Sequence, residues 1–96
     1  SDIIIDPGFG FAKTLEQNYE LMRDLPVIEE MLGRPVLVGV SRKSMITKLC
    51  GINADEALPG TVALNTAAVL AGASILRVHD VAAAVQTVAV AMKLLR

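Results

Sequence analysis

Two segments of the sequence combine cations with hydroxyl or imidazole groups at spacings that favour an anion as ligand. Ser41-Arg42-Lys43-Ser44 follows an apolar run and opens a helical pattern. Cations at a helix N-terminus oppose the helix dipole, so serine hydroxyls, free backbone N–H groups and two cations together indicate an anion site. Further on, Arg77 and His79 are two residues apart, which places them on one face of a strand. We expect Arg77 to be buried in its apolar run, where a guanidinium requires a carboxylate or phosphate partner.

A third segment, 6–13, joins a carboxylate to two aromatic rings. Asp6-Pro7-Gly8 alone is a common turn, in which the carboxylate accepts backbone N–H bonds. Phe9 and Phe11 are two of the three aromatic residues in the chain. A carboxylate beside such an apolar wall can bind the paired N–H donors of a flat heterocycle. The other two segments also have a structural interpretation: a capped helix with solvated cations, and a histidine that serves only the core.

The elements that must position these segments are three continuously apolar runs, at 3–6, 36–41 and 74–78. Runs without alternation are typical of parallel strands buried on both faces. Each is followed by helical sequence, which predicts βαβ units and an α/β fold. Because ligands of such folds bind at the carboxyl ends of the strands, we expect the three segments to surround one pocket.

Helices are predicted at 14–25, 26–32, 43–50, 61–71 and 81–96. The first begins with a capping box formed by Thr14 and Gln17, the second ends at Gly33, and Asp80 is assigned as the cap of the last. In the last helix we expect a core-facing stripe of Val81, Val85, Val88, Met92 and Leu95. Val90 and Leu94 lie off that stripe, so a missing part of the chain or a second subunit should cover them.

Composition excludes several classes of function. The 96 residues are 53% hydrophobic and carry a net charge of −1, which argues against disorder and against electrostatic binding of nucleic acid or an anionic membrane. The single cysteine, Cys50, excludes a disulfide framework and fits a reducing cytoplasm. No apolar run reaches the roughly 18 residues that a membrane span needs. The chain begins almost on a strand and ends in a helical pattern, so we expect one partial domain.

Taken in chain order, the three segments resemble the dihydropteroate synthase family, which carries a D-P-G-x-G-F-x-K loop, an S-R-K-S turn and an R-V-H-D strand end. The resemblance runs the full length of the chain but covers only the last part of the family's barrel. It therefore implies an α/β fold in which residues 1–96 are a single partial domain, the last three βα units of a TIM (β/α)₈ barrel.

The resemblance implies a transferase of folate biosynthesis, a target of sulfonamides. Such an enzyme condenses p-aminobenzoate with 6-hydroxymethyl-7,8-dihydropterin pyrophosphate, giving 7,8-dihydropteroate and pyrophosphate. It implies a cytoplasmic homodimer that pairs through its last helices. Mg²⁺ accompanies the pyrophosphate, with its protein ligand expected outside this chain. The 96-residue piece alone is expected to be inactive, because other pterin-binding residues of the family belong to earlier strands.

Site residues follow from the same resemblance. Lys43, Arg77 and His79 are the implied catalytic residues. Asp6 holds the pterin's N3 and 2-amino edge, and Lys43 bonds its carbonyl and a ring nitrogen. Arg77 lies over the pterin face and, with His79, contacts the pyrophosphate. The p-aminobenzoate pocket is formed by Phe11, Lys43 and Ser44.

One departure and three alternatives remain. The family usually has arginine where this chain has Ala57, and we expect loss of a local ion pair rather than of chemistry. The pterin-binding domain of a folate/corrinoid methyltransferase is the first alternative, although it does not need the anion site. A catalytically inactive fragment is the second. A general phosphate-binding module is the third, and it would leave the paired phenylalanines unexplained.

Overall fold

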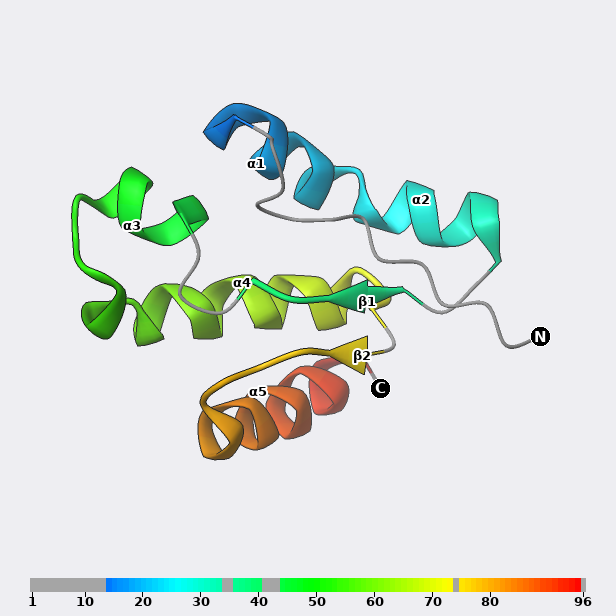
Figure 1. Cartoon of the computed structure of the whole chain (residues 1–96). Helices are drawn as coiled ribbons and strands as arrows, with labels where there is room; N and C mark the ends of the chain where they lie inside the picture. The colour runs from blue at the N-terminus through cyan, green and yellow to red at the C-terminus, as the bar shows by residue number, and fades with distance from the viewer. Residues whose placement is uncertain (1–13, 34–35, 41–43, 74, 96) are drawn as a thin grey trace.

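The computed structural model describes residues 14–33, 36–40, 44–73 and 75–95 (Figure 1). The strand predicted at 3–6 lies outside these residues. In chain order the elements are α1 (Leu15–Arg23), α2 (Leu25–Leu32), β1 (Leu37–Val38), α3 (Ser44–Cys50), the 3₁₀ turn η1 (Ala54–Glu56), α4 (Leu58–Leu70), β2 (Ile75–Leu76) and α5 (Val81–Leu94). Helices thus alternate with short strands, as the apolar runs predict.

The two described strands are parallel, which confirms the α/β prediction. Leu37 pairs with Ile75 and Val38 with Leu76. The N–H of Ile75 donates to the carbonyl of Val36 at 3.2 Å, and the N–H of Arg77 donates to that of Val38 at 2.8 Å. Figure 1 shows α1 and α2 along the β1 side of the pair and α5 next to β2.

Burial is unequal between the strands. Val36, Val38 and Val40 have no exposed surface, and they form the centre of the core with residues of α1, α2, α3 and α4. By contrast, Ile75 is 37% exposed. The prediction that run 74–78 is buried on both faces is therefore wrong for the described residues. β2 is at an edge of the described sheet, and no second described strand covers it.

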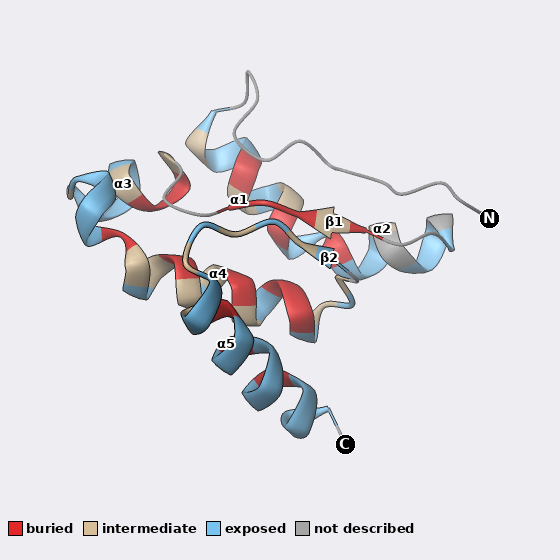
Figure 2. Cartoon of the chain, turned by 60° about the horizontal axis from the view of Figure 1, so that its bottom comes forward, coloured by how far each residue is buried: buried red, intermediate tan, exposed pale blue. Residues whose placement is uncertain are grey.

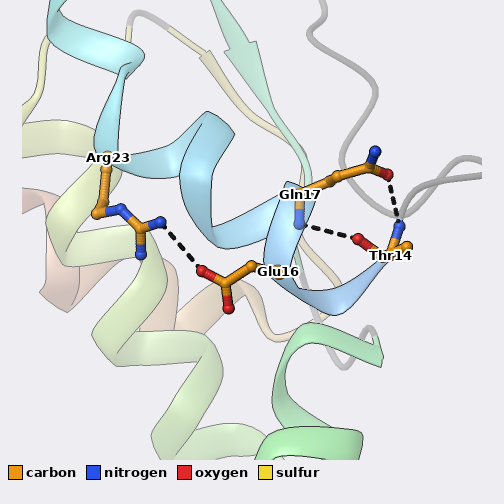
Figure 3. Close-up of polar contacts among 4 residues, drawn as sticks. All are labelled: Thr14, Glu16, Gln17 and Arg23. Carbon is orange, nitrogen blue, oxygen red and sulfur yellow. Dashed lines mark hydrogen bonds and ion pairs between the residues drawn. The ribbon is translucent and has the colours of Figure 1, made fainter.

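The predicted capping box of α1 is confirmed (Figure 3), and so is the glycine at the end of α2. The Thr14 hydroxyl accepts from the N–H of Gln17 at 3.1 Å, and the Thr14 N–H donates to the Gln17 side chain at 2.9 Å. An exposed ion pair of 3.2 Å joins Glu16 to Arg23 on the same helix. Gly33 follows α2 with a φ of 58°, a conformation that favours glycine at a helix end.

Helix α4 begins at Leu58, three residues before the predicted start. Pro59 lies in its first turn, where a missing N–H costs no intrahelical bond. Ala57, the N-cap residue, is fully buried. The loss of a family ion pair at this position stays a prediction.

The face of α5 that packs against the molecule is not the predicted one. Its buried residues are Ala84, Thr87 and Ala91, whereas the expected stripe is exposed, with Val81 and Val85 each 63% accessible. Figure 2 shows most of this helix exposed. Helix α5 contacts α4, and the small side chains of Ala84 and Ala91 are among those that it buries. Asp80 is the N-cap residue, but its side chain forms no capping hydrogen bond.

Among the described helices the longest has 14 residues. None of them has the length and apolar character needed to cross a membrane.

Candidate functional site

The candidate site lies where β1 and β2 end side by side. Val38 pairs with Leu76, so the next residues along, Gly39 and Arg77, are neighbours across the two strands. The 2.8 Å bond from the Arg77 N–H to the Val38 carbonyl fixes the backbone at this point. Side chains of neighbouring residues on paired strands point to the same face. Because Gly39 has no side chain, the Arg77 side chain can lie directly against the backbone at the end of β1.

The guanidinium of Arg77 lies against Gly39. A Cβ built on this buried glycine would be 2.9 Å from both Nε and Nη2 of Arg77, and 3.2 Å from Cζ. The edge that carries Nε and Nη2 is thus nearest to the strand. Elsewhere the side chain is exposed, and it forms no ion pair with any described residue. The prediction of a buried Arg77 is wrong, because β2 is uncovered on this side.

His79 lies two residues beyond Arg77 in the segment that leads into α5, and it is exposed. Within the described part of the chain, no hydrogen bond joins it to Arg77. The structure therefore leaves both side chains accessible to a ligand. Their meeting around one ligand stays a prediction.

Ser44 is the first residue of α3 and is half-buried. The remaining predicted site residues, Asp6, Phe11 and Lys43, lie outside the described residues. The predicted convergence of Lys43 with Arg77 and His79 is therefore untested.

Two contacts hold α3, the helix that begins at Ser44. The hydroxyl of Tyr19, on α1, donates to the backbone carbonyl of Met45 at 2.6 Å. On the other side, Ile46 packs over Gly60 of α4, where an added Cβ would be 2.5 Å from its Cγ2. Helix α3 is thus fixed by α1 and α4, and Ser44 with it.

The environment of Tyr19 favours the neutral phenol. Burial raises the pKa of Tyr19 above its ordinary value of 10.0, and the negative charge of the Cys50 thiolate raises it further. The phenol therefore remains a hydrogen-bond donor at neutral pH. In this form its hydroxyl anchors α3 through the bond to Met45.

The described residues contain no cluster of ligands for the Mg²⁺ ion that the family resemblance implies. No three His, Cys, Asp or Glu side chains of that part of the chain are close enough to bind a metal ion together. We therefore assign no step to the ion. Its association with the pyrophosphate stays a prediction.

Two residues that position the site were not singled out from the sequence. Gly39 could have been identified, because a glycine inside an apolar strand often marks a place where another group approaches the backbone closely. Tyr19 could not have been identified, since its hydrogen-bond partner is a backbone carbonyl 26 residues away in the sequence.

Comparison with known proteins gives consistent results. The family model described as pterin binding enzyme matches residues 1–79. A dihydropteroate synthase of Neisseria meningitidis serogroup B is 54% identical over 84 residues, covering 84% of this chain and 30% of that protein. A dihydropteroate synthase from Coxiella burnetii, solved in complex with pteroic acid, matches with a TM-score of 0.91 and 42% identity over 96% of this chain and 34% of its own. The Yersinia pestis enzyme, solved with a sulfonamide drug, matches with a TM-score of 0.90 and 38% identity over 95% of this chain and 33% of its own.

The chain thus spans about a third of the length of the relatives that it matches. Those relatives are dihydropteroate synthases, as the three sequence segments imply, and the family model covers most of the chain. The structure of the Coxiella burnetii enzyme and that of this chain superpose closely. The chain belongs to the pterin-binding enzyme family.

Proposed function

We propose that this chain forms the last three βα units of a TIM barrel whose complete form is a dihydropteroate synthase. The reaction joins the amino group of p-aminobenzoate to the methylene carbon of 6-hydroxymethyl-7,8-dihydropterin pyrophosphate and releases pyrophosphate. The observation that supports this most is the exposed Arg77 guanidinium at the end of the paired strands, without an ion-pair partner among the described residues.

Charge development explains why cations belong at this strand end. Negative charge grows on the pyrophosphate as the C–O bond breaks, and a cation already in place stabilises it. Arg77 and His79 supply this stabilisation in the proposed site. The positive charge left on the methylene carbon is delocalised into the pterin, so the displacement needs no protein nucleophile.

The remaining roles follow the same chemistry. Asp6 binds the N3 and 2-amino edge of the pterin and its negative charge helps the ring to bear the developing cation. Lys43 bonds the carbonyl and ring nitrogen of the pterin. Phe11, Lys43 and Ser44 form the pocket for p-aminobenzoate, with Ser44 near its carboxylate.

The uncovered face of α5 supports the further proposal of a homodimer paired through the helices, and the single cysteine, Cys50, supports the proposal of a cytoplasmic location. Val90 is 60% exposed and Leu94 is 69% exposed. Side chains of this size are favoured in contact with another apolar surface. Sedimentation should show a species heavier than 10.2 kDa, reduced in mass by Val90→Glu or Leu94→Glu but not by the control Ala82→Glu. A clean monomer unaffected by these changes would contradict the dimer.

Turnover by the full-length protein tests the proposed activity. Dihydropteroate formation should be lost heavily in Lys43→Ala and Arg77→Ala without loss of folding. Arg23→Ala, which removes an exposed cation on α1, is the control and should keep the activity. The 96-residue chain alone should form no product above blank. An Arg77→Ala enzyme with undiminished turnover would refute the proposed role of this strand end.

A further inference from the structure

We propose that Gly39 is a positioning residue for Arg77. Because glycine has no side chain, the Arg77 guanidinium can occupy the space beside residue 39. The inference rests on the proposed function, because it concerns how that site holds the pyrophosphate group. Nε and Nη2 of Arg77 are both 2.9 Å from the position that a Cβ on Gly39 would take. Real Cβ atoms do not approach other atoms so closely, so a side chain at residue 39 and this guanidinium position exclude each other.

The backbone of Gly39 does not itself require glycine. Gly33 and Gly51 have φ values of 58° and 67°, in the region that favours glycine, and nothing surrounds the place of their absent Cβ. Gly39 is not among the glycines of positive φ. An L-residue can therefore adopt its conformation, and alanine would reduce the entropy lost on folding. What excludes alanine is the neighbouring cation.

Gly39 also differs from Gly60 in the atoms that an added Cβ would meet. At Gly60 they belong to Ile46, whose side chain is buried and branched at Cβ. At Gly39 they are the end of a long, exposed side chain. Alanine at residue 39 is therefore accommodated when the guanidinium moves away, while the strand keeps its place. The expected consequence is a change in binding with the fold preserved.

Holding the guanidinium against the strand serves an anionic ligand. A cation placed before the ligand arrives does not have to be ordered on binding. The Nε–Nη2 edge faces the strand end, so the rest of the group is left to the solvent side. Gly39 thus supports the interaction with the pyrophosphate group of the pterin substrate, and not with p-aminobenzoate.

The test compares Gly39→Ala with the unchanged full-length protein, each with Arg77 present or replaced by methionine. With Arg77 present, Gly39→Ala should raise the KM for the pterin pyrophosphate about tenfold, the loss of one charge-assisted hydrogen bond. The KM for p-aminobenzoate and the urea midpoint should stay unchanged. In the Arg77→Met background, Gly39→Ala should have no further effect. Inorganic pyrophosphate, titrated by calorimetry, should show the same pattern of affinities.

The outcomes separate this inference from the proposed function. Normal turnover and normal pyrophosphate affinity in Gly39→Ala overturn the positioning role and leave the function intact. Absence of turnover in the unchanged protein overturns the function, whereas a pyrophosphate affinity that falls only when Arg77 is present still supports the positioning role. Loss of folding in Gly39→Ala that persists with Arg77→Met overturns the inference, because the glycine then serves the strand itself.

Discussion

Tyr19→Phe removes a single oxygen atom that ties α1 to α3. The Tyr19 hydroxyl donates to the Met45 carbonyl at 2.6 Å, a short distance for this kind of bond. Phenylalanine keeps the ring, which packs against the core, so the substitution isolates the hydrogen bond. A neutral intramolecular bond contributes about 1 kcal/mol net. We therefore expect the free energy of unfolding to fall by about 1 kcal/mol, a roughly fivefold change in the unfolding equilibrium constant.

The same residue gives the stability a pH dependence that the variant should lack. Burial, and then the Cys50 charge, raises the pKa of Tyr19 in the folded state above 10.0. Between the unfolded and folded pKa values, the folded state binds more protons, so stability falls as pH rises. The contribution is complete below pH 10 and is lost as pH rises through the folded pKa. Tyr19→Phe should show no such loss from this residue.

Urea unfolding followed by circular dichroism, at neutral pH and in steps above pH 10, measures both effects. Subtracting the curve of the variant removes the titration of lysines and other groups common to both proteins. The slope with urea should be the same in both, since the surface exposed on unfolding does not change. Equal stabilities at neutral pH, together with parallel pH profiles, would show that the bond does not anchor α3.

Three further comparisons, made by the same unfolding assay, test a helix cap, a buried polar atom and a helix contact. Thr14→Ala should lower the free energy of unfolding by about 1 kcal/mol because it removes the capping box. Arg23→Met, which breaks an exposed ion pair, should lower it by less than about 0.5 kcal/mol. Equal losses in the two variants would contradict this. Asn65→Ala should raise the free energy of unfolding by about 1 kcal/mol, since the buried Asn65 Oδ1 has no hydrogen-bond partner among the described residues; a loss would show that packing dominates. Gly60→Ala should cost about 1 kcal/mol by crowding Ile46, and Ile46→Ala should abolish that cost if the contact is its cause.

Features fixed by short stretches of sequence were predictable. The capping box needs only Thr14 and Gln17, and the end of α2 needs only Gly33. Parallel pairing of the runs at 36–41 and 74–78 followed from their continuous apolar character. The exposure of β2 was not predictable, because burial depends on what packs over a strand. Residues of four helices cover β1, whereas Ile75 of β2 is 37% exposed among the described residues.

Spacing alone located the candidate cations but not their surroundings. Arg77 and His79 both follow β2, which ends at Leu76, and their predicted placement on one strand face stays a prediction. That the Arg77 guanidinium rests on Gly39 depends on the register between two strands separated by 36 residues of chain. Tyr19 donates a hydrogen bond to a backbone carbonyl. Every residue has such a carbonyl, so the sequence does not show which one is the partner.

Helix α5 shows why hydrophobic periodicity cannot choose between two apolar faces. Helix α5 contacts α4 and buries Ala84, Thr87 and Ala91. Val81, Val85 and Val88 instead line a groove of about 430 Å³ with Leu76 and Met92. Fully burying a side chain such as valine contributes about 1.5–3 kcal/mol, while a whole domain is stable by only about 5–15 kcal/mol. Covering the exposed parts of these side chains would therefore contribute several kcal/mol, a large fraction of the stability of a typical domain. In the proposed barrel, the remaining units would supply that cover, and the stability of α5 would depend on them as much as on α4.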